Sequence, residues 1–240
     1  MHHHPRRPPC AETVPAPRHD SYGPSWTSGA PAGRSIPLED FVVLRLGDDL
    51  GQLDDELARG RSLLFTPGTY QVGKTLTIKR ADSVVLGLGF PTLTPTRGNV
   101  TMSVADVPGV DISGLIFDAG RRNSPVLLQV GPKNAHKGDA ADPTALQDVF
   151  FRIGGAAAGT VDVSLQVNTD HTIRDDVWSW RADHGNGVGW TVTPANTGLV
   201  VNGDDVTAYG LFVEHYQKAE VRWNGNGGTA RMSRDQEGDR

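Results

Sequence analysis

The segment HTIRDDVWSWRADHG (residues 171–185) contains the pattern that decides the fold of this chain: an apolar residue, a polar step, then a run of branched or aromatic residues. The same pattern recurs elsewhere, and aligning the copies places five apolar residues at one position, at intervals of 27, 34, 28 and 34: Leu88, Leu115, Val149, Val177 and Leu211. An imperfect repeat of this length predicts a solenoid whose coils stack their strands in parallel.

The repeated segments are short, end in Gly, Asp or Asn, and follow one another almost without interruption from residue 62 onward. A β-sandwich would show hairpin signals about every 8–12 residues, and these repeats are too long for that. We therefore predict an all-β protein with the right-handed parallel β-helix architecture of pectate-lyase-like solenoids.

One segment, LGDDLGQLDDELARGR (residues 46–61), has helical periodicity. Its four leucines are spaced 4, 3 and 4 apart and form a single apolar stripe: Leu46, Leu50, Leu53 and Leu57. Asp48 or Asp49 is placed to cap the start, and Gly60 is placed to end the helix. We expect this helix to cover the open N-terminal end of the solenoid, which would otherwise be an aggregation-prone edge.

Composition limits the partners and divides the 240 residues into three parts. The net charge of −5 favours neither nucleic acid nor anionic lipid, and no stretch approaches the roughly 18 apolar residues of a membrane span. We expect a disordered tail over residues 1–36, a β-helix domain over residues 37–228, and a polar tail over residues 229–240. The single Cys10 excludes an internal disulfide, and we expect a monomer without a cofactor.

Residues 68–75, GTYQVGKT, match the phosphate-loop pattern G-x-x-x-x-G-K-[ST]. That loop binds phosphates only when a strand precedes it and a helix follows it. Here Leu76 and Ile78 alternate with polar residues, which indicates a strand. We interpret the match as accidental, with Pro67 and Gly68 forming a turn between two strands.

Three residues beyond each of the last four aligned positions lies a column of side chains that could bind a ligand or take part in a reaction: Asp118, Arg152, Trp180 and Glu214. Coils stack at roughly 4.8 Å, so a straight column separates Asp118 from Glu214 by about 14 Å. Glycosidase carboxylate pairs lie about 5–5.5 Å or about 6.5–9.5 Å apart. Asp183, one coil from Glu214, is therefore the better partner, unless these acids form ordinary ion pairs with Arg152 or Arg181.

The tryptophans around this column have two interpretations. Trp180 next to carboxylates suits stacking on a sugar ring, because an outward indole offers an apolar face and a polar edge. Trp178 and Trp190 are expected to pack at a coil corner. Arg181 is counted among the substrate-binding residues together with Trp180.

His184 and His215 each follow an acidic residue and are expected on adjacent coils. A cluster of histidine and carboxylate could tune a pKa or orient a base, whereas the simpler alternative is a structural hydrogen bond. A polysaccharide lyase would need several carboxylates to bind calcium. The acidic doublets at residues 175–176 and 204–205 are better explained as turn residues, so no metal site is predicted.

Several stretches resemble a known group of proteins. LLFTPGTYQVGKTLTI and VVLGLGFPTL resemble the entry into pectate-lyase-like β-helices. SPVLLQVG, WSWRADHG, NTGLVVNGDDVTAYGLFVEHYQ and VRWNGNGG are similar to actinobacterial secreted β-helix proteins related to laminarinase-type glycoside hydrolases, which are exo-β-1,3-glucanases. The resemblance covers roughly residues 37–228.

The resemblance implies an active-site carboxylate at Glu214 and a water-positioning or substrate-binding amide at Gln129. It implies a glycoside hydrolase that acts on a β-glucan-like polysaccharide, outside the cell, although the N-terminus has no apolar signal region. The family's downstream Glu-Pro-aromatic motif is missing, and residues 229–240 read TARMSRDQEGDR instead. The alternatives are therefore a carbohydrate-binding β-helix without catalysis, or an inactive fragment shortened at its C-terminal end.

Overall fold

The computed structural model describes residues 11–15 and 33–231. Most strands belong to two parallel sheets, and the chain alternates between these sheets from β10 to β17. The first sheet contains, in spatial order, β18 (Thr229–Arg231), β16 (Thr207–Glu214), β14 (Ile173–Arg181), β12 (Ala145–Ile153), β10 (Asp111–Asp118), β7 (Val84–Gly87), β4 (Ser62–Phe65) and β3 (Phe41–Leu44), with β5 (Thr69–Val72) and β8 (Thr92–Pro95) beside them.

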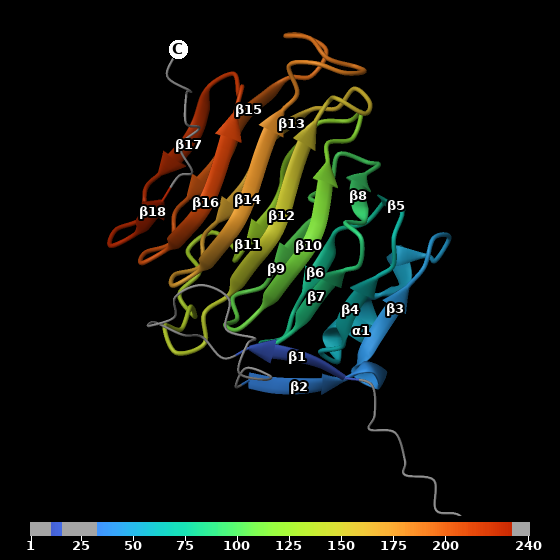
Figure 1. Ribbon diagram of the computed structural model, residues 1–240, viewed down its shortest axis with the longest axis vertical. Helices are drawn as coiled ribbons and strands as arrows, with labels where there is room; N and C mark the ends of the chain where they lie inside the picture. Colours follow the sequence, from blue (N-terminus) through green and yellow to red (C-terminus); the bar gives the residue numbers. More distant parts are fainter. Residues whose placement is uncertain (1–10, 16–32, 232–240) are drawn as a thin grey trace, which may run out of the picture.

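The second sheet has six strands, in the order β17 (Ala219–Trp223), β15 (Ala195–Val201), β13 (Val161–Val167), β11 (Ser124–Val130), β9 (Met102–Val104) and β6 (Leu76–Ile78). Figure 1 shows the successive strands of the first sheet lying side by side in the order of the chain. The predicted all-β class with parallel stacking is confirmed. The repeat alignment contained only strands of the first sheet, and of the second sheet the sequence predicted the strand at Leu76 and Ile78, which is β6.

The strand register confirms most of the aligned position. Leu115 pairs with Val149, Val149 with Val177, and Val177 with Leu211. The fifth member, Leu88, was wrongly included, since it lies just after β7 and is 44% exposed. The reason is that β10 pairs with β7 only up to Ser113 and then pairs with β8 from Ile116 onward.

Each long strand of the first sheet has one residue that the pairing skips, at the same level of the stack: Gly114, Asp148, Asp176 and Gly210. These four residues, the skipped rung, all have positive φ, between 52° and 71°. The skipped rung lengthens the spacing of inward residues to three, so Ile112 and Leu115 are both buried. The doublet at 175–176 was predicted to lie in a turn. It lies inside β14 instead, because Asp176 belongs to the skipped rung of this strand.

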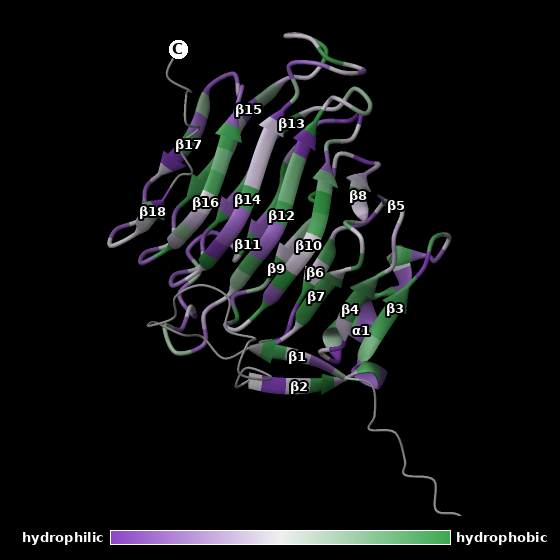
Figure 2. Ribbon diagram, viewed as in Figure 1, coloured by the Kyte–Doolittle hydropathy of each residue, from purple (hydrophilic) through white to green (hydrophobic). Residues whose placement is uncertain are grey.

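The core lies between the two sheets. Figure 2 shows hydrophobic colour concentrated along the strands and hydrophilic colour along many of the loops. Inward side chains of both sheets join one buried cluster, including Phe117 and Phe151, whose rings stack at 5.3 Å, and Leu128 and Leu165 from the second sheet. Residues that alternate with these point outward, and they carry the chemistry of the surface.

The predicted helix is shorter than its leucine stripe. It consists of a 3₁₀ turn, η3 (Leu50–Gln52), capped by Asp49, and α1 (Asp54–Ala58). Leu50, Leu53 and Leu57 are buried in the core, as expected, and Gly60 has the positive φ of 82° that ends a helix. Leu46 was wrongly included, because it lies in the preceding loop and is 61% exposed.

Residues of both predicted tails form strands in the described part of the chain. β1 (Ala11–Pro15) pairs antiparallel with β2 (Gly33–Pro37), which corrects the expectation of disorder for those residues. Ile36 buries its side chain against the outer face of the first sheet, where a second apolar cluster includes Phe41, Leu64 and Val84. At the other end, β18 adds to β16, so residues 229–231 are not a free tail. The histidines at 2–4 and Cys10 lie outside the described residues.

The phosphate-loop lookalike is confirmed as accidental. Its residues form β5 and the turn before β6, and no helix follows them. Lys74 instead donates to the carboxylate of Asp54 on α1. Within the described residues, no helix has the length and apolar character to cross a membrane.

Candidate saccharide site

The predicted column exists in the first sheet: Asp118 pairs with Arg152, Arg152 with Trp180, and Trp180 with Glu214. Asp118 and Arg152 form a two-point ion pair, with Nε to Oδ1 and Nη2 to Oδ2 both at 2.8 Å. This hydrogen bond raises the pKa of Arg152. Asp118 is therefore an ion-pair partner, as the simpler alternative proposed, and Glu214 lies three strands away from it.

Beyond the end of β14, Asp183 lies between two histidines. Its Oδ1 atom is 2.7 Å from His184 Nδ1, and its Oδ2 atom is 3.7 Å from His215 Nε2. The hydrogen bond from His184 lowers the pKa of Asp183. All three side chains are exposed. The structure thus brings together the predicted cluster, with the carboxylate in its charged form.

The tryptophans have a different exposure from the one predicted. Trp178 is 42% exposed and donates from Nε1 to Glu214 Oε2 at 3.0 Å, so it does not pack at a buried corner. Trp180 is half-buried, because Trp178 stacks on it at 5.6 Å and His184 approaches it at 5.1 Å. Alternation from buried Val177 places residues 178 and 180 on the same outer face, and this signal was available in the sequence.

Arg181 is 6% exposed, so its side chain lies beneath the surface of the site. Its guanidinium donates to the carbonyl oxygens of Thr193, His215, Gly189 and Trp190, at 2.8, 3.2, 3.1 and 3.4 Å. It forms no ion pair with Asp183, in contrast to one of the alternatives. Backbone carbonyls use the donors of Arg181, so its side chain positions the loop and the turn around it, and a contact with substrate stays a prediction.

The position of His215 depends on the residue that follows it. His215 has a φ of 68°, which turns the chain sharply after β16. The next residue, Tyr216, inserts its ring into the core, and its hydroxyl lies 2.7 Å from both Ser164 Oγ and Ser179 Oγ. Burial raises the pKa of Tyr216 well above its ordinary value, so the hydroxyl stays protonated. This anchor fixes the turn that presents His215.

Gln129 is not part of this arrangement. It lies in β11 of the second sheet, where it alternates with buried Leu128 and Val130 and so faces away from the core. Its amide donates to the carbonyl oxygen of Gly131 at 3.1 Å. Glu214 faces away from the core on the first sheet, so the two side chains lie on different faces of the stack. A role for Gln129 stays a prediction.

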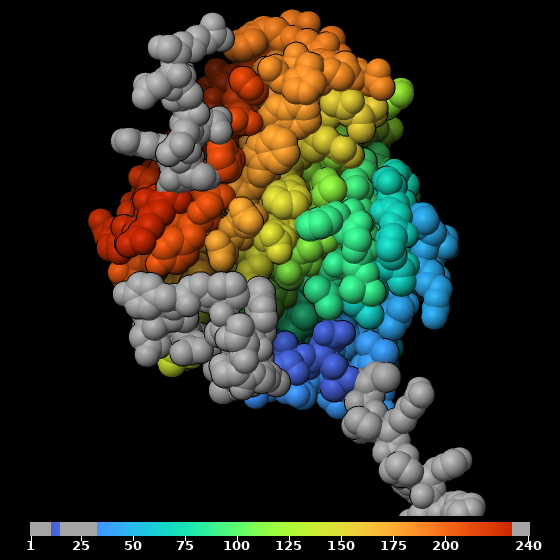
Figure 3. Space-filling view, viewed as in Figure 1, coloured from blue at the N-terminus to red at the C-terminus, as the bar shows by residue number. Residues whose placement is uncertain are grey.

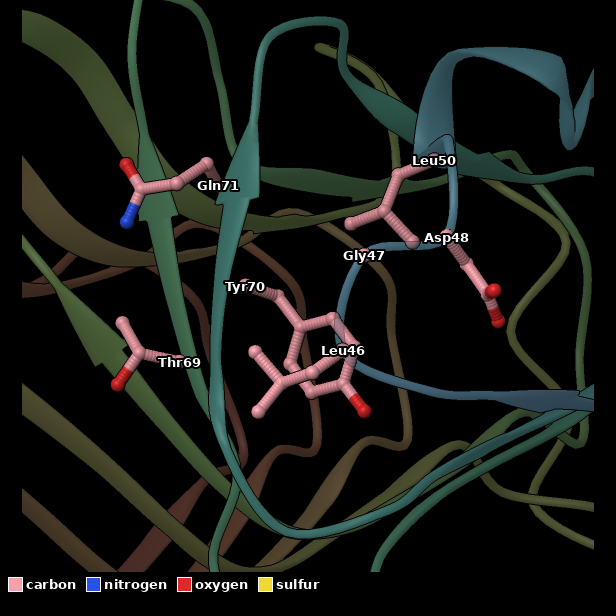
Figure 4. A pocket seen from close by; sticks show the side chains of 7 residues that line it. All are labelled: Leu46, Gly47, Asp48, Leu50, Thr69, Tyr70 and Gln71. Carbon is pink, nitrogen blue, oxygen red and sulfur yellow. The ribbon is translucent and has the colours of Figure 1, made fainter.

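Two hollows lie elsewhere, against the N-terminal coils. One has a volume of about 240 Å³ and is lined by Leu46, Gly47, Asp48, Leu50, Thr69, Tyr70 and Gln71 (Figure 4). Its neighbour measures about 320 Å³ and adds Lys74 and Arg97 to the lining. Neither hollow reaches Asp183 or Glu214. In the part of the chain that is described, no three His, Cys, Asp or Glu side chains have the geometry of a metal site.

The surface at the end of β14 and β16 suits a polar, flat ligand. It combines carboxylates, which accept hydrogen bonds from hydroxyl groups, with imidazoles, whose ring nitrogens donate or accept hydrogen bonds. Exposed indoles beside them offer apolar faces. This combination is the one that sugar rings require, since a pyranose has an apolar face and a hydroxyl rim.

Comparisons with known proteins agree with this chemistry. A family model described as LAM55 pectate lyase-like domain matches residues 41–234. The chain is 47% identical over 215 residues to an exo-beta-1,3-glucanase of Streptomyces sp. (strain SirexAA-E / ActE). That match covers 90% of this chain and 36% of the relative, so the chain spans about a third of the relative's length.

Two solved structures from the same Streptomyces strain are similar. The structure of sacteLam55A has a TM-score of 0.88 at 47% identity, and the match covers 91% of this chain and 40% of that one. An ensemble refinement of a glutamate-to-alanine variant of sacteLam55A in complex with glucose has a TM-score of 0.89 at 46% identity, and covers 92% of this chain and 40% of that one.

Proposed function

The chain belongs to the LAM55 pectate lyase-like domain family, and from this premise we propose that it is the saccharide-facing unit of a glycoside hydrolase that acts on a β-1,3-glucan. The observation that carries the proposal is the 47% identity to an exo-beta-1,3-glucanase over 90% of this chain. The glucose complex of a similar structure supports a sugar ligand. We further propose that the protein works outside the cell, where polysaccharides are found.

The same premise supports a finer description of the fold. We propose that the alternation between two parallel sheets follows a right-handed β-helix. Strand-to-strand crossovers within a parallel sheet are right-handed in almost all proteins, and each coil here returns to the first sheet through a strand of the second.

Within the site, Glu214 and Asp183 are the proposed reacting carboxylates. Glu214 is oriented by the indole N–H of Trp178, and Asp183 is kept charged by His184. In this proposal the charged Asp183 activates water, and Glu214 acts on the glycosidic oxygen. Trp178, Trp180, His184 and His215 would contact the sugar, and Gln129 is proposed as a separate binding position on the second sheet.

The direct test is glucose release from laminarin, a soluble β-1,3-glucan, by the chain and by its Glu214→Gln variant. We expect the variant to lose at least about 100-fold in rate, the scale of a general acid or base. Glu39→Gln removes an exposed carboxylate on the 3₁₀ turn η2 (Leu38–Asp40) and should leave the rate unchanged. Equal rates for Glu214→Gln and the wild-type chain would remove Glu214 from the mechanism.

Two other outcomes would favour other functions. Laminarin binding without glucose release would indicate a carbohydrate-binding unit. Neither binding nor release would indicate that the chain is inactive on its own, and since it spans 36% of its relative, the aligned glutamate should then be replaced in that longer protein.

A further inference from the structure

Trp190 is the most exposed of the large apolar side chains in the described part of the chain, at 67%. It lies in the loop between β14 and β15, residues 182–194, together with Val192, which is 49% exposed. This orange segment forms the top of the molecule in Figure 3 and extends past the strand ends in Figure 1. Tryptophan in such an exposed position is favoured where one face of the ring meets a ligand.

The loop around Trp190 is held rigidly although the ring is exposed. The guanidinium of Arg181 lies 5.1 Å from the ring centroid, a cation–π contact. The carbonyl oxygen of Trp190 accepts from Gln217 Nε2 at 2.6 Å, in addition to its contact with Arg181. The side chain of Thr193 and its backbone amide both donate to Gly189, at 3.0 Å. A preformed loop loses little conformational entropy when a ligand binds.

The same contacts tie Trp190 to the proposed site. Arg181 donates to the carbonyls of both Trp190 and His215, and Gln217 follows His215 by two residues. Asp183 belongs to the same loop and lies 3.7 Å from His215. The exposed indole is therefore anchored on the very turn that carries the imidazole facing Asp183.

We propose that Trp190 is a stacking platform for a pyranose ring of the glucan, next to the ring contacted by Asp183 and His215, and that Arg181 holds this platform in place. The inference rests on the proposed function, because it assigns an additional sugar position to the same site. The ligand class is a neutral β-linked oligosaccharide, recognised by the apolar face of one ring.

The test is titration of the chain with laminari-oligosaccharides of two to six units, measured by calorimetry. Trp190→Ala should weaken binding of the longer oligosaccharides by about tenfold, while glucose itself should bind with little change. Trp190→Phe should restore part of the loss. Arg181→Met should weaken binding with the indole still present, provided that circular dichroism shows the fold intact.

Tyr209→Ala is the matched control, because Tyr209 is also exposed, at 41%, and also faces a guanidinium, that of Arg231, at 5.7 Å. It should leave the affinity unchanged. If the wild-type chain binds oligosaccharides and Trp190→Ala binds them equally well, the platform is refuted while the proposed function stands. If the wild-type chain binds no glucan, the platform is refuted for this chain, and replacing the aligned glutamate in the longer relative then decides the proposed function separately.

Discussion

Asp111 at the start of β10 links the stability of the protein to pH. Burial raises its pKa from 3.8 to about 6; Arg34 on β2 opposes this shift, whereas Asp142 and Asp82 add to it. Arg34 itself donates to the carbonyl oxygen of Asp82 at 2.8 Å, which joins the β1–β2 hairpin to this cluster. The folded protein therefore prefers the neutral acid at position 111.

A raised pKa contributes stability that is complete below the unfolded value and is lost as pH rises through the folded value. We predict that the free energy of unfolding falls between about pH 4 and pH 6, by up to about 3 kcal/mol from this group. Asp111→Asn should remove most of that slope and be the more stable protein at pH 7. Urea unfolding of both proteins at several pH values measures how the free energy of unfolding depends on pH.

Asp142 has a pKa raised in the same direction by burial and by Asp82, so a shallow slope should persist in Asp111→Asn. Asp40→Asn, which removes an exposed carboxylate, should follow the wild-type curve. Identical pH profiles for the wild type and Asp111→Asn would contradict the assignment.

At the scale of single residues, the candidate site was only partly predictable from the sequence. Asp183, His184 and His215 were expected together, and the register confirms that Trp180 and Glu214 are neighbours. The exposure of Trp190 was misjudged, because the sequence does not show that the guanidinium of Arg181 holds the backbone of this loop. The exposure of Trp178 was also misjudged, although strand alternation from Val177 predicts it.

Among the elements, the skipped rung of the first sheet places the strongest demand on residue type. Its members have positive φ, which glycine adopts freely and which aspartate or asparagine tolerates. A Cβ on Gly114 would also meet the carbonyl oxygen of Gly87 at 2.6 Å. Two substitutions at this rung should therefore differ in sign.

Gly114→Ala should lower the free energy of unfolding by about 2 to 3 kcal/mol, from backbone strain and the clash with Gly87. Asp148→Asn keeps a tolerated residue and removes a carboxylate whose pKa is raised by burial and by repulsion from Asp176 and Asp175. It should be neutral or stabilising by less than about 1 kcal/mol. Denaturant unfolding measures the change in the free energy of unfolding for both variants. Equal changes would refute the special role of this rung.

The segment formed by η3 and α1 shows what helical periodicity in the sequence can predict. Of the four leucines in the predicted stripe, three are buried and one is exposed, so the stripe identified the apolar face but overestimated the helix length. Gly47, with a φ of 97°, interrupts the helical backbone directly after Leu46. Helix boundaries depend on such local backbone states, whereas the apolar face follows from spacing alone.

At the scale of the whole molecule, Tyr216 joins the two sheets. Its hydroxyl contacts Ser164 on β13 of the second sheet and Ser179 on β14 of the first, and both serines are buried. Tyr216→Phe would leave two buried hydroxyls without this partner. We predict a loss of about 1–3 kcal/mol in the free energy of unfolding, measured by thermal or denaturant melts.

Tyr209→Phe removes the same hydroxyl from an exposed tyrosine and should change stability by less than about 0.5 kcal/mol. The loss in Tyr216→Phe should be accompanied by weaker glucan binding, because Tyr216 fixes the turn of His215. A variant as stable as the wild type would show that the two sheets are joined by apolar packing alone.

The sequence by itself determined the all-β class, the coil repeat and the order of one outward column, because parallel strands stack equivalent positions and alternation decides which side chains face out. Tertiary structure alone decided that β10 pairs first with β7 and then with β8. It also decided the burial of Arg174, which lies in register with Leu146 and Ala208 on the neighbouring strands. The pairing of residues 11–15 with residues 33–37 was likewise not contained in the sequence pattern. These depend on contacts between segments far apart in the chain, whose free energies no local pattern contains.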